Sequence, residues 1–278
     1  MDHLKLPKRL RNNMTWTSKY CELHTYIKDG VEHVKPVQKI LINGNEVCPR
    51  CQTEKWNKNL QGEVQQYYDD LLAKHKQNVL FTKSILNDKT ITNASIDLYI
   101  TDNQEERQNK DLCLEIMDCL KEGQVFNVLI QGNPGAGKSH LAYSILRELN
   151  QSGKVSCLFI DIDQMLRHIR SSFNYKDSHY TEGYFIKLLS SVDFLVLDDL
   201  GAETGAIETY KSATDFVQRI LYAVTNARQD KVTISTTNLS SEQLFSIYDK
   251  KLVSRLLRNP KFILFKETRD KRITGLPF

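Results

Sequence analysis

Short apolar runs alternate with amphipathic stretches over the second half of the chain. Strands are predicted where apolar and β-branched residues concentrate, at residues 125–131, 192–201, 231–240 and 261–267. Helices are predicted from periodic apolar positions at residues 104–123, 139–149, the first part of 161–190, and 248–260. Strands that alternate with helices in this way indicate an α/β fold class.

The first 103 residues follow different patterns. Residues 26–47 predict two short strands forming a hairpin, with turn signals at Asp29-Gly30 and Asn43-Gly44. Residues 60–77 predict a helix, with apolar side chains at Val64, Tyr67, Tyr68, Leu71 and Leu72. Residues 79–103 show no sustained period and contain many Asn, Asp, Ser and Thr residues, which indicates a boundary. We therefore expect one domain at 1–77 and a second at 78–278.

The composition sets broad limits on the class of protein. The 38 basic and 34 acidic residues give a net charge of +4, which is compatible with nucleic-acid contact but does not demonstrate it. The N-terminus lacks the apolar core of a signal peptide, and no segment approaches the ~18 apolar residues of a membrane span. We therefore expect a cytoplasmic protein with no membrane partner, whose six cysteines bind metal or are simply buried.

Two pairs of metal-ligand side chains precede residue 52. Cys21 pairs with His24 and Cys48 with Cys51, and 23 residues separate the pairs. Such pairs grip a tetrahedral ion from two turns, and a shell of three thiolates and one imidazole has no open position. The spacing predicts a structural Zn²⁺ site that docks against the following helix. His33 is the alternative ligand, and four unrelated buried residues are the alternative interpretation.

Residues 132–139, GNPGAGKS, fit the pattern G-x-x-x-x-G-K-[ST] between a predicted strand and a predicted helix. In this setting backbone N–H groups point at phosphates, the lysine reaches the β and γ oxygens, and the serine hydroxyl binds Mg²⁺. The pattern predicts ATP binding with Mg²⁺, and Lys138 is also a catalytic candidate. The predicted ATP-binding residues are Gly132, Asn133, Pro134, Gly135, Ala136, Gly137, Lys138, Ser139 and His140.

Polar residues end the next two predicted strands. Asp198 is expected to bind Mg²⁺ together with Ser139, because carboxylates at this edge of the sheet accompany phosphate loops. Asp199 is expected to orient or deprotonate the attacking water, with a helix cap or a supporting role behind the metal ligands as the alternative. Asn238 lies where it can contact the γ-phosphate or its water, although a turn asparagine is the commoner fate of such a residue.

Arg255 and Arg258 share one face of the last predicted helix. Surface arginines are usually solvated, and this is the default interpretation. An arginine that one subunit projects into a neighbour's site would instead neutralise charge developing on the γ-phosphate.

Taken together, GNPGAGKSHLA, FLVLDDLGAE, ISTTNLS and KLVSRLLR resemble the AAA+ ATPases of the bacterial replicative helicase loaders of the DnaC/DnaI type, including phage-encoded relatives. The resemblance extends from about residue 80 to the end and implies a P-loop domain with a five-stranded parallel sheet. It also implies that Asn238 is the first sensor and Arg255 the arginine finger. Asp199 stands where most members carry glutamate, which puts robust hydrolysis in doubt. The metal module resembles that of the DnaI branch.

Too few residues follow 261–267 for the C-terminal helical lid of most AAA+ proteins. Arg269 and Arg272 are the candidates to replace the sensing arginine of that lid.

Residues 161–190 resemble the helix that contacts single-stranded DNA in loaders and initiators. Arg167 and Arg170 would pair with phosphates and Tyr175 would stack on a base, with a solvated basic face as the alternative. The stripe Met165, Leu166, Ile169 and Phe173 is expected to face the core.

The resemblance implies an ATP-dependent loader that binds a DnaB-type hexameric replicative helicase through its zinc module and self-assembles through its ATPase domains. It would place the helicase on single-stranded DNA during initiation of DNA replication. Three alternatives stay open: an IstB-like ATPase assisting a transposase on duplex DNA, a P-loop nucleoside or shikimate-like kinase, and a protein, for example from a phage, that captures a helicase while scarcely hydrolysing ATP. The sequence offers neither the arginine-rich lid nor the acceptor pocket that the kinase needs.

Overall fold

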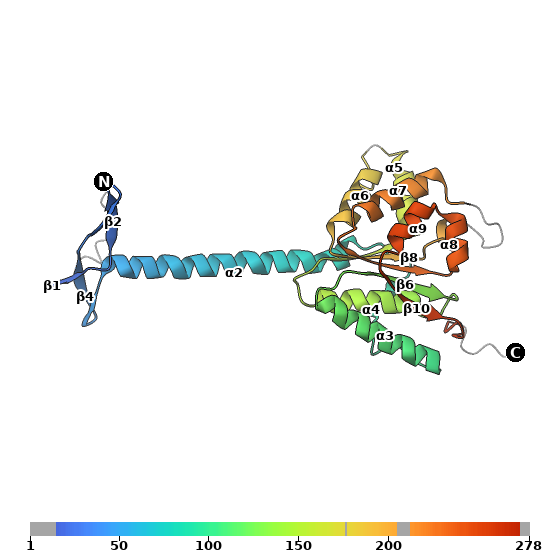
Figure 1. Cartoon of the computed structure of the whole chain (residues 1–278), viewed down its shortest axis with the longest axis horizontal. Coiled ribbons are helices and arrows are strands. Elements are labelled where there is room, and N and C mark those ends of the chain that lie inside the picture. Colours follow the sequence, from blue (N-terminus) through green and yellow to red (C-terminus); the bar gives the residue numbers. More distant parts are fainter. Residues whose placement is uncertain (1–14, 176, 205–211, 273–278) are drawn as a thin grey trace. The chain divides into compact units, whose positions relative to one another are not determined.

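The computed structural model describes residues 15–175, 177–204 and 212–272 (Figure 1). The chain divides into two compact units, Met1–Leu71 and Leu72–Phe278, whereas the sequence places the boundary after residue 77. Each unit is described by itself. None of the helices within the described ranges combines the length and apolar character that a membrane span needs.

Two small antiparallel sheets form the first unit. The strands β1 (Thr15–Cys21), β4 (Val37–Ile42) and β5 (Asn45–Val47) make one sheet in the order β1-β4-β5. The strands β2 (Thr25–Lys28) and β3 (Val31–Val34) make a separate hairpin. The prediction of two strands in residues 26–47 is therefore wrong, because four are present.

Each of the two predicted turns closes its own hairpin. Asp29 and Gly30 join β2 to β3 with φ angles of 53° and 78°, and Asn43 and Gly44 join β4 to β5 with φ angles of 49° and 82°. Two consecutive left-handed residues match the twist of the strands they connect, which is why Asp-Gly and Asn-Gly are favoured here. The two turn signals therefore encode two hairpins rather than one.

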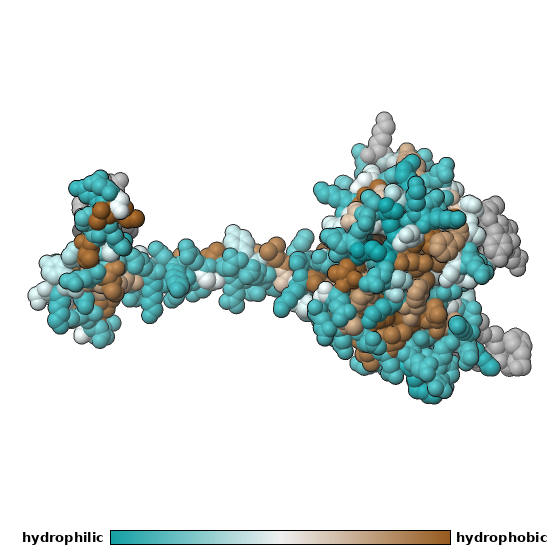
Figure 2. Space-filling model, viewed as in Figure 1, coloured by the Kyte–Doolittle hydropathy of each residue, from teal (hydrophilic) through white to brown (hydrophobic). Residues whose placement is uncertain are grey.

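The helix α2 (Pro49–Lys83) starts directly after Cys48 and is longer than the helix predicted at 60–77. Cys51 lies in its first turn, so the helix itself carries a predicted metal ligand. In the first unit the predicted apolar face is exposed: Val64 is 46%, Tyr67 63% and Leu71 44% exposed. Figure 2 shows apolar residues scattered among hydrophilic ones along this helix. The predicted metal ligands Cys48 and Cys51 therefore lie at the start of this helix and not against its apolar face.

A five-stranded parallel sheet in the order β10-β6-β9-β8-β7 forms the centre of the second unit. Its strands are β6 (Asn127–Gly132), β7 (Cys157–Asp161), β8 (Phe194–Asp198), β9 (Val232–Thr237) and β10 (Pro260–Phe265). Because all pairs are parallel, the carboxyl ends of the strands meet at one edge, where ligands bind in open α/β sheets. The predicted α/β fold with five parallel strands is confirmed. The lack of a C-terminal helical lid stays a prediction.

Helices cover both faces of this sheet (Figure 1). One face carries α3 (Gln104–Lys121) and α4 (Lys138–Asn150), and the other carries α5 (Ile162–Ser172), α6 (Glu182–Ser191), α7 (Asp215–Asn226), α8 (Ser241–Ile247) and α9 (Lys250–Leu256). Successive strand residues point to opposite faces. Val128 and Ile130 accordingly pack in the cluster of α3 and α4, whereas Leu129 packs in the cluster of the other helices.

Residues 79–103, where the sequence indicates a boundary, are packed onto the second unit. Leu80, Ala94 and Tyr99 are buried, and residues Lys89–Asn93 form a short 3-10 helix, η1. Arg147 of α4 donates to the carbonyl of Ala94 at 3.0 Å. The buried apolar residues of this segment lie mostly in loops, and therefore no helical or strand period reveals them.

The predicted core stripe of α5 is correct except at its end. Met165, Leu166 and Ile169 are fully buried, but Phe173 is 65% exposed. The helix ends at Ser172 and Phe173 is its C-cap, so this side chain leaves the stripe. Its ring lies edge-on to Phe216, with 5.9 Å between the ring centroids.

Candidate nucleotide and metal sites

The predicted phosphate loop connects β6, which ends at Gly132, to α4, which begins at Lys138. Gly137 caps α4 with a φ of 89°, and a Cβ there would lie 2.5 Å from the ring of Tyr99. Gly135 has a φ of 74°, and a Cβ there would collide with the carboxylate of Asp270. Both positions require glycine for the backbone angle and for the close approach of a neighbour.

Lys138 is buried, and its ammonium donates to three oxygens. It lies 2.8 Å from the carbonyls of Gly132 and Asn133 and 2.6 Å from Oδ1 of Asn238. Burial lowers the pKa of Lys138, and the carboxylates of Asp199 and Asp198 oppose that shift. The cation is thus held at the loop by neutral acceptors, and a phosphate would make stronger charge-assisted hydrogen bonds.

The ends of β8 and β9 are joined by a hydrogen-bond network. The hydroxyl of Thr236 donates to Oδ1 of Asp198 at 2.6 Å and accepts from the N–H of Asp199 at 2.9 Å. Nδ2 of Asn238 donates to Oδ1 of Asp199 at 3.0 Å. The structure therefore brings Lys138, Asn238 and both aspartates together.

Asp198 and Ser139, the residues predicted to bind Mg²⁺, line the same cavity. Burial, followed by the charges of Asp199 and Asp161, raises the pKa of Asp198 to about 6, although hydrogen bonds from Thr236 and Ser139 oppose the shift. A buried carboxylate among other carboxylates favours a nearby cation. Hydroxyl and carboxylate oxygens are ligands that Mg²⁺ prefers. The residues at this position therefore fit Mg²⁺.

These side chains line one cavity of about 450 Å³. Lys138, Ser139, Asp198, Asp199 and Asn238 form its polar end, and apolar residues of the segment 86–100 line another part. A cavity with a charged end and an apolar wall suits a nucleotide, which has a polyphosphate and a base.

The other predicted loop residues lie around the same cavity. Pro134, Gly135 and His140 line it, and Nε2 of His140 lies 2.9 Å from the carbonyl of Ser95. Ala136 is buried, and its carbonyl accepts from the hydroxyl of Tyr99 at 3.0 Å. Tyr99 was not predicted as a site residue, because no period or motif marks it.

Arg255 does not line this cavity. Its guanidinium carbon lies 4.5 Å from the centroid of the Tyr222 ring, and its Nε donates to Oδ1 of Asn226 at 3.2 Å. Its NH1 donates to the carbonyl of Lys251, also at 3.2 Å. Three groups of α7 and α9 therefore fix its orientation. Its role as an arginine finger stays a prediction that concerns a second copy of the chain.

The predicted metal ligands Cys21, His24, Cys48 and Cys51 form one cluster, in which the ligand atoms lie within 4.8 Å of one another. The sulfurs of Cys21 and Cys51 are 3.7 Å apart, and Nε2 of His24 lies 3.2 Å from the sulfurs of Cys48 and Cys51. In a tetrahedral zinc shell with Zn–S bonds of about 2.3 Å, the sulfurs are about 3.8 Å apart. The cluster therefore fits Zn²⁺.

A further contact supports a metal at this cluster. Nδ1 of His24 lies 3.5 Å from Oε1 of Glu54, so this carboxylate is placed to orient the ring that presents Nε2. The alternative ligand His33 is not in the cluster but stacks on Tyr26, with 5.5 Å between the ring centroids.

The predicted DNA-contacting residues are only partly free. Nε of Arg167 lies 2.7 Å from Asp163, and the guanidinium carbon of Arg170 lies 5.8 Å from the centroid of the Phe216 ring. Tyr175 is 68% exposed. A basic and aromatic surface exists at the end of α5, and its contact with DNA stays a prediction.

The parallel sheet, the phosphate loop and the paired aspartates define a P-loop ATPase of the AAA+ type. Residues 71–259 match the family model described as IstB-like ATP binding protein. The chain therefore belongs to the family of IstB-like ATP binding proteins.

Solved structures agree on the fold. The crystal structure of the DnaC helicase loader matches with a TM-score of 0.52 and 22% identity, covering 64% of this chain and 100% of that one. The crystal structure of DnaI matches with a TM-score of 0.53 and 19% identity, covering 65% of this chain and 95% of that one. At these identities the likeness shows that the fold is shared, and no more.

Curated relatives include the replicative helicase loader DnaC of Escherichia coli (strain K12), which is 27% identical over 156 residues. The alignment covers 55% of this chain and 60% of that relative. The uncharacterized protein YdaV of Escherichia coli (strain K12) is 24% identical over 211 residues, covering 74% of this chain and 79% of the relative. The resemblance to loaders of the DnaC/DnaI type is therefore confirmed, and the DnaI branch in particular stays a prediction.

Proposed function

We propose that this protein is an ATP-dependent loader that binds a DnaB-type hexameric replicative helicase and places it on single-stranded DNA during initiation of DNA replication. The observation that carries the proposal is the network in which Asn238 joins Lys138 to Asp199, because it links phosphate binding to the strand ends that would read the γ-phosphate. Support for the partner comes from curated relatives that are named replicative helicase loaders. We place its action in the bacterial cytoplasm, in the service of a cell or of a phage.

In the proposed ATP cycle, the loop amides and Lys138 bind the β and γ phosphates. The phosphate oxygens replace Asn238 as acceptors for Lys138, so Asn238 becomes free to contact the γ-phosphate or its attacking water. Asp199 accepts a hydrogen bond from that water and orients it. Mg²⁺, held by Ser139 and Asp198, would supply neutralisation of phosphate charge. We expect slow turnover, because Asp199 is one methylene shorter than the usual glutamate.

The first unit is proposed to hold the helicase. A closed zinc shell stabilises a module too small to have a large core. The hairpin β2–β3 and the loop before it expose apolar side chains: Leu23 is 82%, Ile27 78% and Val31 57% exposed. Exposed apolar residues grouped on one small module are typical of a protein-binding surface.

The ATPase units are proposed to assemble with one another and with DNA. Arg255 would enter the neighbouring subunit's cavity and neutralise charge on the γ-phosphate. Arg167 and Arg170 would pair with DNA phosphates, and Tyr175 would stack on a base of a single strand.

Native mass spectrometry with a DnaB-type hexamer tests the proposal. The full chain is expected to form a complex with the hexamer, and Ile27→Ser together with Leu23→Ser is expected to weaken it at least tenfold. Lys138→Ala is the matched control that leaves this surface intact, and it should retain binding to the helicase while losing ATP. If the doubly substituted protein still bound the hexamer with unchanged affinity, the proposed helicase-binding surface would be wrong. If the unaltered protein bound no replicative helicase, the loader assignment would be wrong.

A second candidate is supported by the family model, which is named for IstB. In that case the ATPase would assist a transposase on duplex DNA. The two functions differ in DNA preference, so ATP-dependent binding to fluorescent single strands and duplexes of equal length separates them. A preference for the duplex, with ATP turnover stimulated by a transposase, would favour the second candidate.

A further inference from the structure

The segment that follows β10 runs across the phosphate loop. The N–H of Lys271 donates to the carbonyl of Gly135 at 3.1 Å. The carboxylate of Asp270 packs on the same glycine, where a Cβ would lie 1.7 Å from Oδ1 of Asp270. The N–H of Arg272 donates to that Oδ1 at 2.8 Å, and Arg272 lines the nucleotide cavity. This segment, residues 266–272, is called the tail below, and it forms part of the cavity wall.

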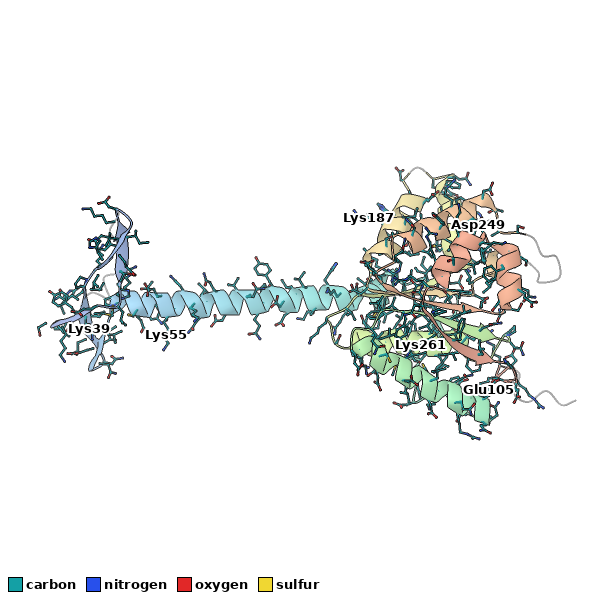
Figure 3. All side chains as sticks on the ribbon, viewed as in Figure 1. Lys39, Lys55, Glu105, Lys187, Asp249 and Lys261 are labelled. Carbon is teal, nitrogen blue, oxygen red and sulfur yellow. The ribbon has the colours of Figure 1, made fainter. Side chains whose placement is uncertain are left out.

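Two adjacent glutamates at the start of α3 hold the tail. Glu105 accepts from the N–H groups of residues 266–268 at 2.8 to 3.1 Å and from the hydroxyl of Thr268 at 2.8 Å. Figure 3 shows Glu105 in the first turn of α3, near the carboxyl end of β10. The buried carboxylate of Glu106 accepts from Nζ of Lys271 at 2.8 Å. Nζ of Lys271 also lies 4.4 Å from the centroid of the Tyr99 ring.

The charges of these groups keep the tail in place at neutral pH. Burial opposes ionisation of Glu105 and Glu106, but the hydrogen bonds from the tail outweigh it and lower the pKa of both carboxyls. Both glutamates are therefore ionised at neutral pH. An ionised acceptor makes a stronger hydrogen bond than a neutral one, so five donors of the tail backbone and side chains are firmly engaged.

Arg272 lies within electrostatic reach of the phosphate end of the cavity. Burial has the largest influence on the pKa of Lys138, and the charge of Arg272 lowers it further. Arg272 lines the same cavity as Lys138 and as Asp88, which caps η1. Arg272, the phosphate-binding lysine and the segment 86–100 therefore contribute to one cavity wall.

We propose that Arg272 is a ligand for the polyphosphate of ATP, supplied in cis by the tail, and that Glu105 and Glu106 are positioning residues for it. The proposal rests on the proposed function only in that the cavity must bind ATP. A guanidinium matches phosphate oxygens in charge and in the spacing of its N–H donors. Glu105 and Glu106 hold residues 266–271 in place and so fix the backbone that carries Arg272. Less conformational freedom is then lost when the arginine binds phosphate.

Arg269 provides a matched control within the same tail. It is exposed and does not line the cavity. Binding of a fluorescent ATP analogue to the full chain compares the unaltered protein with Arg272→Ala and Arg269→Ala. We expect Arg272→Ala to raise the Kd for ATP about tenfold, as for loss of one charge-assisted hydrogen bond of about 1.4 kcal/mol. Arg269→Ala should stay within twofold of the unaltered protein.

Competition by adenosine tests the assignment to the polyphosphate. Adenosine lacks phosphates, so its inhibition constant should be the same in the unaltered protein and in Arg272→Ala. Equal ATP affinity in these two proteins would overturn this inference alone, and so would an equal loss of affinity for adenosine and ATP. Failure of the unaltered protein to bind ATP would overturn the proposed function and this inference with it.

A double-mutant cycle tests the positioning role. Glu106→Gln alone should weaken ATP binding several-fold, and it should have no further effect when Arg272 is already alanine. A purely structural role would instead give additive losses in the double variant, and that result would overturn the assignment of Glu106. Glu105→Gln is expected to behave in the same way, and the melting temperature of each variant without nucleotide shows whether the fold is retained.

Discussion

Asn238 and Asp199, at the ends of the neighbouring strands β9 and β8, are joined by a hydrogen bond of 3.0 Å. The carbonyl oxygen of the same asparagine accepts from Nζ of Lys138 at 2.6 Å. Both functional groups of this amide are therefore engaged, one with the phosphate-binding cation and one with the carboxylate proposed to orient water. A ligand that displaces Asn238 from Lys138 would therefore also disturb the hydrogen bond from Asn238 to Asp199.

Asn238→Ala is expected to lower the kcat of ATP hydrolysis by about ten- to a hundredfold while the KM for ATP changes little, because the loop amides and Lys138 still bind the phosphates. Steady-state release of phosphate measures both constants. Asn238→Asp is the informative companion, since a second carboxylate beside Asp199 should also lower kcat. A raised KM with unchanged kcat would mean that Asn238 serves only ground-state binding.

Arg255→Ala is expected to lower kcat while leaving ATP binding by the same subunit intact, because Arg255 lies outside the cavity of its own chain. Mixing this variant with Lys138→Ala should restore turnover, since one protein supplies an intact cavity and the other an intact arginine. Arg258→Ala, three residues further on, is the control. Absence of restored turnover in the mixture would contradict a role in a neighbouring subunit.

The metal cluster is expected to bind one Zn²⁺ per chain, and Cys48→Ser should abolish it. Elemental analysis of the purified protein measures the metal, and Cys119→Ser is the control because Cys119 lies outside the cluster. Glu54→Gln should weaken zinc affinity by about tenfold in competition with a chromophoric chelator, because the orientation of His24 is then less well fixed. Equal zinc content in Cys48→Ser and in the control would exclude the cluster.

Arg228 is expected to be the most sensitive charged residue for the stability of the ATPase unit. It is 2% exposed, and its guanidinium donates to Oγ1 of Thr233 and to four backbone carbonyls at the ends of α6 and β9 and in the turn after α6. Burial lowers the pKa of Arg228 to about 10, so it stays charged at neutral pH. Arg228→Ala should lower the free energy of unfolding by about 3 kcal/mol or more, measured in urea. Arg219→Ala, at an exposed ion pair with Glu182, should lower the free energy of unfolding far less than Arg228→Ala.

The sheet and its phosphate loop were predictable because they depend on local patterns. The strands β6 and β8 are largely buried on both faces, and their apolar runs are therefore continuous in the sequence. The loop needs glycine, lysine and serine at fixed spacing, and Asp198 and Asn238 follow from the rule that parallel strands end at one edge. These features need no knowledge of distant contacts.

Tyr99, Glu105 and Lys271 were missed because their roles arise only from tertiary contacts. Tyr99 lies in a loop and reaches Ala136 across 37 positions of the chain, and Glu105 reaches Thr268 across 163. No period or motif connects such residues in the sequence. Phe173 was misassigned for a related reason, since helical spacing continues in the sequence one residue beyond the point where α5 ends.

Asp199 has a φ of 61°, in the left-handed region that few side chains other than glycine, asparagine and aspartate adopt readily. Aspartate at this position therefore meets two requirements: it tolerates the left-handed backbone, and it provides the carboxylate beside the proposed water. Lengthening it to glutamate would bring the acid nearer to the phosphate but would place a less tolerant residue at the strained position. Any effort to speed turnover at this position must therefore relax the turn after β8 before it can benefit from a longer side chain.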